Sequence, residues 1–136
     1  MVNLKNFLKV GELRFIIINI FSFCFIIACN KIVSKSQLLF KDCKIYSNKE
    51  IFTGKYEFYR GDNYVLSYVV KGELKNEKTY KNDILLMEKI YYECNNGYQK
   101  DYDLVGNKIS EGSFILNKRI GEWKYFTNDS IYFVKY

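Results

Sequence analysis

The feature that most constrains the fold of this chain is the alternation of apolar and polar side chains that begins near Glu50. In Tyr64–Val70, for example, tyrosine, leucine and valine share one face because successive side chains of a β-strand point to opposite sides. Similar short segments recur as far as Tyr132 and Val134, and no segment after residue 49 shows apolar residues at helical spacing. The pattern predicts an all-β domain over residues 50–136.

Composition and turn signals favour hairpins within that domain. The chain has 13 Tyr and 11 Phe but no Pro, and aromatic residues are enriched in strands. The strongest turn signal is Asn95-Asn96-Gly97, since Asn-Gly tolerates the two positive φ angles of a type I′ turn. Gly106-Asn107 predicts a further turn. We therefore expect an antiparallel meander of short strands.

Two segments of the domain are similar to each other. Gly54–Tyr59 and Gly121–Phe126 both read glycine, any residue, aromatic, charged, aromatic, aromatic. Together with the stretch 114–126, they resemble the bacterial variant of the MORN repeat, found in the YwqK-like antitoxin family. The resemblance implies an elongated antiparallel meander of β-hairpins and protein partners. Family members have glycine where this chain has Asp83, Asn117 and Asp129; Asp and Asn are the other residues that best tolerate left-handed turns.

The N-terminal segment has the pattern of a bacterial lipoprotein signal peptide. Basic residues at 5, 9 and 14 precede a mostly apolar run, which ends in Ile26-Ile27-Ala28-Cys29. This end resembles a lipobox, in which cleavage occurs before a lipid-modified cysteine. We expect a helical, cleavable signal over 1–28 and lipid attachment at Cys29; an uncleaved signal anchor is the alternative. Asn30 is not the aspartate typical of inner-membrane retention, which favours the outer membrane of the bacterial cell envelope.

Residues 29–49 are predicted to be a lipid-anchored tether and lead-in segment, in which the polar stretch Asn30–Gln37 is a flexible spacer. The domain over 50–136 follows it. Basic residues are spread along the chain without the clusters of a nucleic-acid surface, so no nucleic-acid partner is expected.

The sequence predicts no catalytic residue, cofactor or metal site. With no histidine, the chain cannot form a Ser-His-Asp or Cys-His site or a His-ligated zinc site. Asp101 and Asp103 share a face of a predicted strand, and we interpret them as solvated rather than as a catalytic or calcium-binding pair. The aromatic residues next to basic ones are interpreted as packing residues of the sheet rather than as a platform for bases or sugars. They are Tyr56, Phe58, Trp123 and Tyr125.

Cys43 and Cys94 remain after the signal and the lipidated cysteine are set aside. Their even number and the expected compartment favour a disulfide. A linear ladder of hairpins opposes it, because strands lie about 4.8 Å apart and several would separate the two cysteines. We give the strand separation more weight and predict two free thiols. A bond requires residues 38–46 to fold back across the sheet.

These observations predict a lipid-anchored, non-catalytic binding module of the cell envelope, held to membrane lipid through Cys29 and acting on a protein partner. The first alternative, implied by the family resemblance, is an antitoxin or immunity-type protein that sequesters a toxin. An envelope enzyme or a glycan-binding protein ranks after it.

Overall fold

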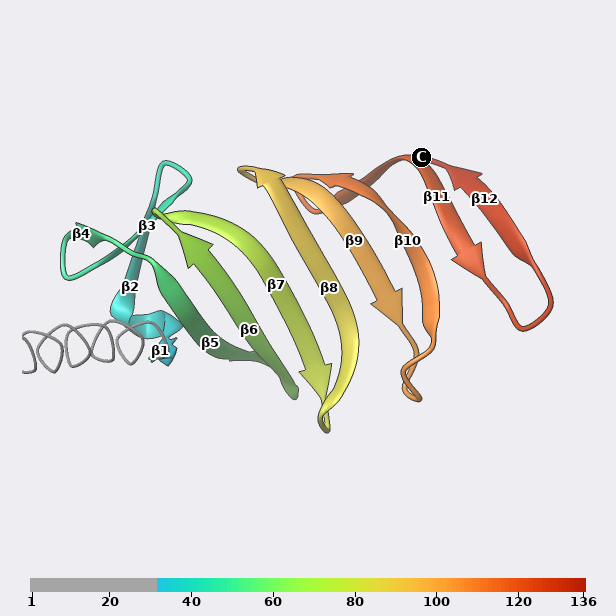
Figure 1. Ribbon diagram of the computed structural model, residues 1–136, viewed down its shortest axis with the longest axis horizontal. Coiled ribbons are helices and arrows are strands. Elements are labelled where there is room, and N and C mark those ends of the chain that lie inside the picture. Colours follow the sequence, from blue (N-terminus) through green and yellow to red (C-terminus); the bar gives the residue numbers. More distant parts are fainter. Residues whose placement is uncertain (1–31) are drawn as a thin grey trace, which may run out of the picture. The chain divides into compact units, whose positions relative to one another are not determined.

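The computed structural model describes residues Ile32–Tyr136, which form one compact unit (Figure 1). The predicted signal peptide and Cys29 lie outside the described residues. The strands are β1 (Ile32–Ser34), β2 (Leu38–Lys41), β3 (Lys44–Ser47), β4 (Glu50–Ile51), β5 (Gly54–Arg60), β6 (Asn63–Val70), β7 (Glu73–Lys81), β8 (Ile84–Glu93), β9 (Asn96–Tyr102), β10 (Lys108–Ile115), β11 (Lys118–Phe126) and β12 (Ile131–Lys135). A short 3₁₀ turn, η1 (Lys35–Gln37), joins β1 to β2.

Most strands belong to one nine-stranded sheet, the main sheet. Its order is β1-β5-β6-β7-β8-β9-β10-β11-β12, so that β5 to β12 pair with their chain neighbours, all antiparallel (Figure 1). β1 pairs with β5 in parallel at one edge. The prediction of an all-β, antiparallel meander is therefore confirmed for the described residues.

Tight loops with two consecutive positive φ angles join many of these strands, as a type I′ turn requires. They are Asp42-Cys43, Asn48-Lys49, Lys71-Gly72, Asn82-Asp83 and Leu116-Asn117. Asp83 (φ 63°) and Asn117 (φ 61°) thus occupy left-handed positions, as expected from the tolerance of Asp and Asn for such turns. Asp129 does not: it is absent from the positive-φ residues of the described chain.

The hairpin predicted at Asn95-Asn96-Gly97 exists, but its turn lies earlier in the chain than predicted. Glu93 pairs with Asn96, which leaves Cys94 and Asn95 in the loop and places Gly97 inside β9. The glycine is needed there for a different reason: a Cβ at Gly97 would lie 2.0 Å from the carbonyl oxygen of Ile90 on the neighbouring strand. Close approach of two backbones, rather than turn geometry, accounts for this residue.

The prediction of a flexible spacer before the domain is wrong for its described part. Residues 32–34 pair with β5, and β2, β3 and β4 form a separate three-stranded sheet, the small sheet. The small sheet packs on the main sheet through Ile45, which forms a buried cluster with Tyr56 of β5 and Val69 of β6. Backbone hydrogen bonds from the Ile45 amide to Gly72 and from the Gly72 amide to Phe52 fasten the two sheets together. The segment is therefore part of the folded domain.

The face of the main sheet that meets Ile45, here the inner face, carries the core. Tyr56 and Trp123 lie on it and are 2% and 0% exposed, as expected for packing residues, while Phe58 and Tyr125 are partly buried. Trp123 covers Gly112 so closely that a Cβ on that glycine would lie 2.5 Å from the indole ring. The indole N–H donates to the Ser113 carbonyl at 2.8 Å.

The opposite, outer face has a row of alternating charges across five strands. The pairing register places Lys78, Glu88, Lys100, Glu111 and Lys124 opposite one another in turn on β7 to β11. The carboxylate of Glu88 lies 3.5 Å from the Lys78 ammonium and 3.4 Å from that of Lys100. Opposite charges on directly paired positions favour this register over a shifted one.

We expect Trp123→Ala to destabilise the domain by about 3–5 kcal/mol, because it removes a fully buried aromatic ring and leaves a cavity above Gly112. Urea unfolding followed by far-UV circular dichroism measures the change. Tyr59→Ala, at a residue 74% exposed, is the matched control and should shift stability far less. Equal effects of the two substitutions would contradict the packing role of Trp123.

Candidate functional site

A pocket of about 500 Å³ lies where the small sheet meets the end of the main sheet. Three turns of the main sheet, β6–β7, β8–β9 and β10–β11, come together there, and the turn between β2 and β3 lies against them. The lining residues are Phe40–Ile45, Glu73–Lys75, Tyr91–Asn95 and Asn117. The pocket thus joins segments that are distant in sequence, and no local pattern marks it.

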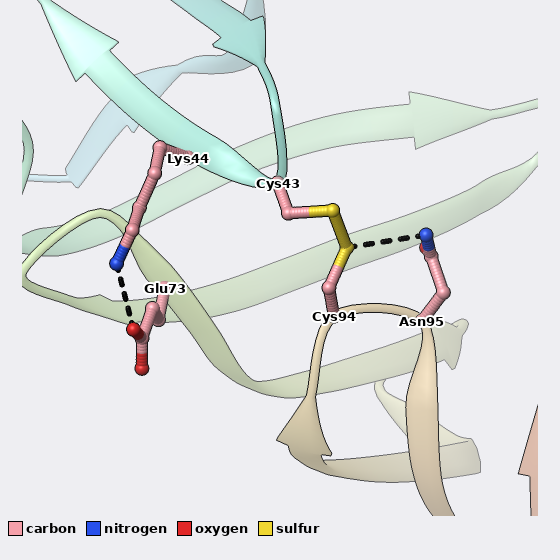
Figure 2. The surroundings of a disulfide bond; sticks show 5 residues. All are labelled: Cys43, Lys44, Glu73, Cys94 and Asn95. Carbon is pink, nitrogen blue, oxygen red and sulfur yellow. Dashed lines mark hydrogen bonds and ion pairs between the residues drawn. A yellow bond between two sulfur atoms is a disulfide. The ribbon is translucent and has the colours of Figure 1, made fainter.

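A disulfide between Cys43 and Cys94 closes one side of this pocket (Figure 2). The prediction of two free thiols is wrong: the two Cα atoms are 5.6 Å apart, within the range of a bridge. The error arose from treating residues 38–46 as the start of the ladder. Because these residues form the small sheet instead, with β3 against β7, the β2–β3 turn places Cys43 beside the β8–β9 turn.

Both cysteines lie in loops, so the disulfide is accessible to solvent. Cys43 holds the second left-handed position of its turn, at φ 62°, and Cys94 begins a loop whose next residue, Asn95, has φ 58°. Both cysteines are exposed. The side-chain amide of Asn95 donates through Nδ2 to the Cys94 sulfur at 3.2 Å (Figure 2).

A three-residue charge cluster lies beside the disulfide. The carboxylate of Glu73 accepts from the ammonium group of Lys44 at 2.7 Å, so that β3 and β7 are joined by an ion pair (Figure 2). It also accepts from the ammonium group of Lys75 at 2.8 Å. Hydrogen bonds from these two ammonium groups lower the pKa of Glu73 from 4.5 to about 2. The carboxylate is exposed, so the pair is open to solvent and to salt.

The other wall of the pocket is aromatic and amide-bearing. Tyr91 packs edge-on against Phe114, with ring centroids 5.4 Å apart, and burial raises the pKa of its hydroxyl. Asn117 accepts a 2.8 Å hydrogen bond from the ammonium of Lys89, whose pKa is lowered by burial. The pocket thus offers aromatic rings for apolar contact with a ligand, and amide and charged groups for hydrogen bonds to it.

Asp101 and Asp103, which we interpreted from the sequence as solvated rather than as a functional pair, have separate hydrogen-bond partners. Asp101 lies on the inner face and accepts from Gln99, Ser110 and Arg119, the last at 3.1 Å, so the prediction of a solvated side chain is wrong for it. Asp103 follows β9 and accepts from the amides of Val105 and Asn107 in the next loop. Each carboxylate thus has a structural role of its own.

Cys29, the predicted site of lipid attachment, lies outside the described residues. Within Ile32–Tyr136 no group of three or more Asp, Glu or Cys side chains is arranged to hold a metal ion. The same part of the chain contains no helix of the length and apolarity needed to cross a bilayer. A scan against protein-family models, a search of curated proteins and a search of solved structures each found no match to this chain.

Replacing both cysteines, Cys43→Ser with Cys94→Ser, should lower the free energy of unfolding. The bond closes a loop with a sequence separation of 51, for which the chain-entropy model gives roughly 4 kcal/mol. Urea titration of the oxidised protein and of the double variant measures the difference. Recovery of Cys43 and Cys94 in separate peptides after unreduced digestion would contradict the bond itself.

The lowered pKa of Glu73 predicts a pH-dependent contribution to stability. Its folded-state pKa is about 2 against an ordinary value of 4.5, so the contribution is complete above about pH 4.5 and disappears as the pH falls towards 2. We expect the Tm difference between the wild type and Glu73→Gln to shrink over this range, and to be smaller in high salt. A difference that is independent of pH would contradict the ion pair.

Proposed function

We propose that this protein is a lipid-anchored binding module of the bacterial cell envelope, without catalytic activity, that acts on a protein partner. The observation that carries the proposal is the Cys43–Cys94 disulfide, which lies in the part of the chain that follows the signal-like segment. Disulfides form and persist in oxidising compartments outside the cytosol. A structural bond in the domain therefore supports export, which the N-terminal pattern also predicts.

The binding role is supported by the surface around the pocket. Phe40 (44% exposed) and Tyr92 (62% exposed) both line it, and aromatic residues are enriched at protein interfaces. Lysine and acidic side chains surround them, as in the polar rim of an interface. The sequence resemblance to MORN repeats implies a meander of hairpins, which the main sheet has, and it also implies protein partners.

Lipidation is tested on Cys29. Mass spectrometry of the protein from a bacterial host should show a new N-terminus at Cys29 that carries a diacylglyceryl group, and the protein should fractionate with membranes. Each buried methylene contributes about 0.8 kcal/mol, so two or three acyl chains hold a protein firmly. A Cys29→Ser protein that remains membrane-bound with an unchanged mass would contradict the anchor.

The binding role is tested by crosslinking in envelope extracts. The wild type should capture a defined partner, and Tyr92→Ala should lose it, because this substitution removes an exposed ring at the pocket. Tyr59→Ala, on the outer face and 74% exposed, is the matched control and should retain it. Equal capture by the two variants would place the interface elsewhere.

A further inference from the structure

The small sheet has an outward side that the main sheet covers only in part, where Ile51 lies beside Gly72 of the β6–β7 turn. Ile45 points into the core, so the alternation of side chains turns Leu39, Tyr46 and Ile51 to the other side. These three are directly paired across β2, β3 and β4 and form one apolar row, the small-sheet row. Leu39 is 60% exposed and Ile51 59%, high values for aliphatic residues in strands, while Tyr46 between them is partly buried.

Positive charge surrounds the small-sheet row. Between residues 35 and 51 the chain has four lysines and two carboxylates. Lys41 and Lys44 are directly opposite each other on the outward side, an arrangement that is unfavourable between neighbouring strands. Glu73 compensates Lys44, whereas Lys41 has no ion pair within the described residues. An anionic surface would supply the counter-charge that Lys41 lacks.

The length of chain before the domain limits where such a surface lies. Cys29 is three residues from Ile32, and a fully extended chain spans at most about 3.5 Å per residue. A lipid on Cys29 therefore holds the start of β1 within roughly 10 Å of the attachment point. β1 to β4 all gather at the β5 end of the main sheet, the end that this short link brings to the bilayer (Figure 1).

We propose that the small-sheet row is a membrane-docking surface: Leu39, Tyr46 and Ile51 enter the headgroup region while Lys41 meets anionic lipids. The proposal rests on lipidation at Cys29. Apolar residues flanked by lysines are the composition of surfaces that bind the interface of anionic bilayers. Lipid anchoring and docking then act together. The lipidated cysteine limits the distance of the domain from the bilayer, and the small-sheet row fixes the orientation of the domain on it.

The test is hydroxyl-radical footprinting of the lipidated protein in vesicles of phosphatidylethanolamine and phosphatidylglycerol, read by mass spectrometry. We expect Leu39, Tyr46 and Ile51 to lose most of their oxidation relative to the folded Cys29→Ser protein without vesicles. Ile131 and Phe133, which are 53% and 58% exposed in β12, are the internal control and should stay reactive. Lys41→Glu should restore oxidation of the row, whereas Lys135→Glu in β12 should not.

Each other outcome has a distinct meaning. A lipidated, membrane-bound protein whose small-sheet row is as reactive as β12 would overturn docking and leave the proposed anchor intact. A protein without the lipid, or one absent from membranes, would overturn the anchor and docking together. Protection of the row that persists after the vesicles are replaced by phosphatidylcholine and that Lys41→Glu does not change would show a protein contact and overturn docking on anionic lipid.

Discussion

The constraint on which this structure depends is that a single-layer sheet must cover one of its own faces. In the β5–β7 region the small sheet provides the cover, through Ile45 against Tyr56 and Val69. Near β11 the cover comes from one large side chain, since Trp123 fills the space that Gly112 leaves open. Between these two regions the inner face is partly polar, and its buried groups need partners from their own sheet.

The polar middle of the inner face contains several contacts between charged groups that resemble a catalytic site but stabilise the fold. Glu77 is 5% exposed and lies 3.6 Å from Arg60, while Lys89, paired directly with Glu77 across β7 and β8, donates to Asn117. Asp101 is likewise surrounded by donors. Because buried charges without partners are strongly destabilising, we interpret these groups as structural.

Sequence reasoning succeeded where the structure depends on local rules. Alternation identifies the strands, and the left-handed positions of Asp83 and Asn117 follow from their small polar side chains. It failed where two distant segments meet. Gly97 was assigned to a turn because Asn-Gly is a strong local signal, but the nearby carbonyl of Ile90 on another strand determines its role. The prediction of two free thiols was wrong for the same reason, since formation of the disulfide depends on the fold of residues 38–46.

The pocket could not be predicted because its walls come from four separate segments, and only their packing brings Asn117 near Phe40. The small sheet links that pocket to the proposed membrane surface through adjacent residues of one strand. In β2, Phe40 turns inward and packs edge-on against Tyr56 at 5.7 Å, while Leu39 turns outward. A two-residue period thus gives one short strand both roles, and the disulfide at its end fixes it to the main sheet.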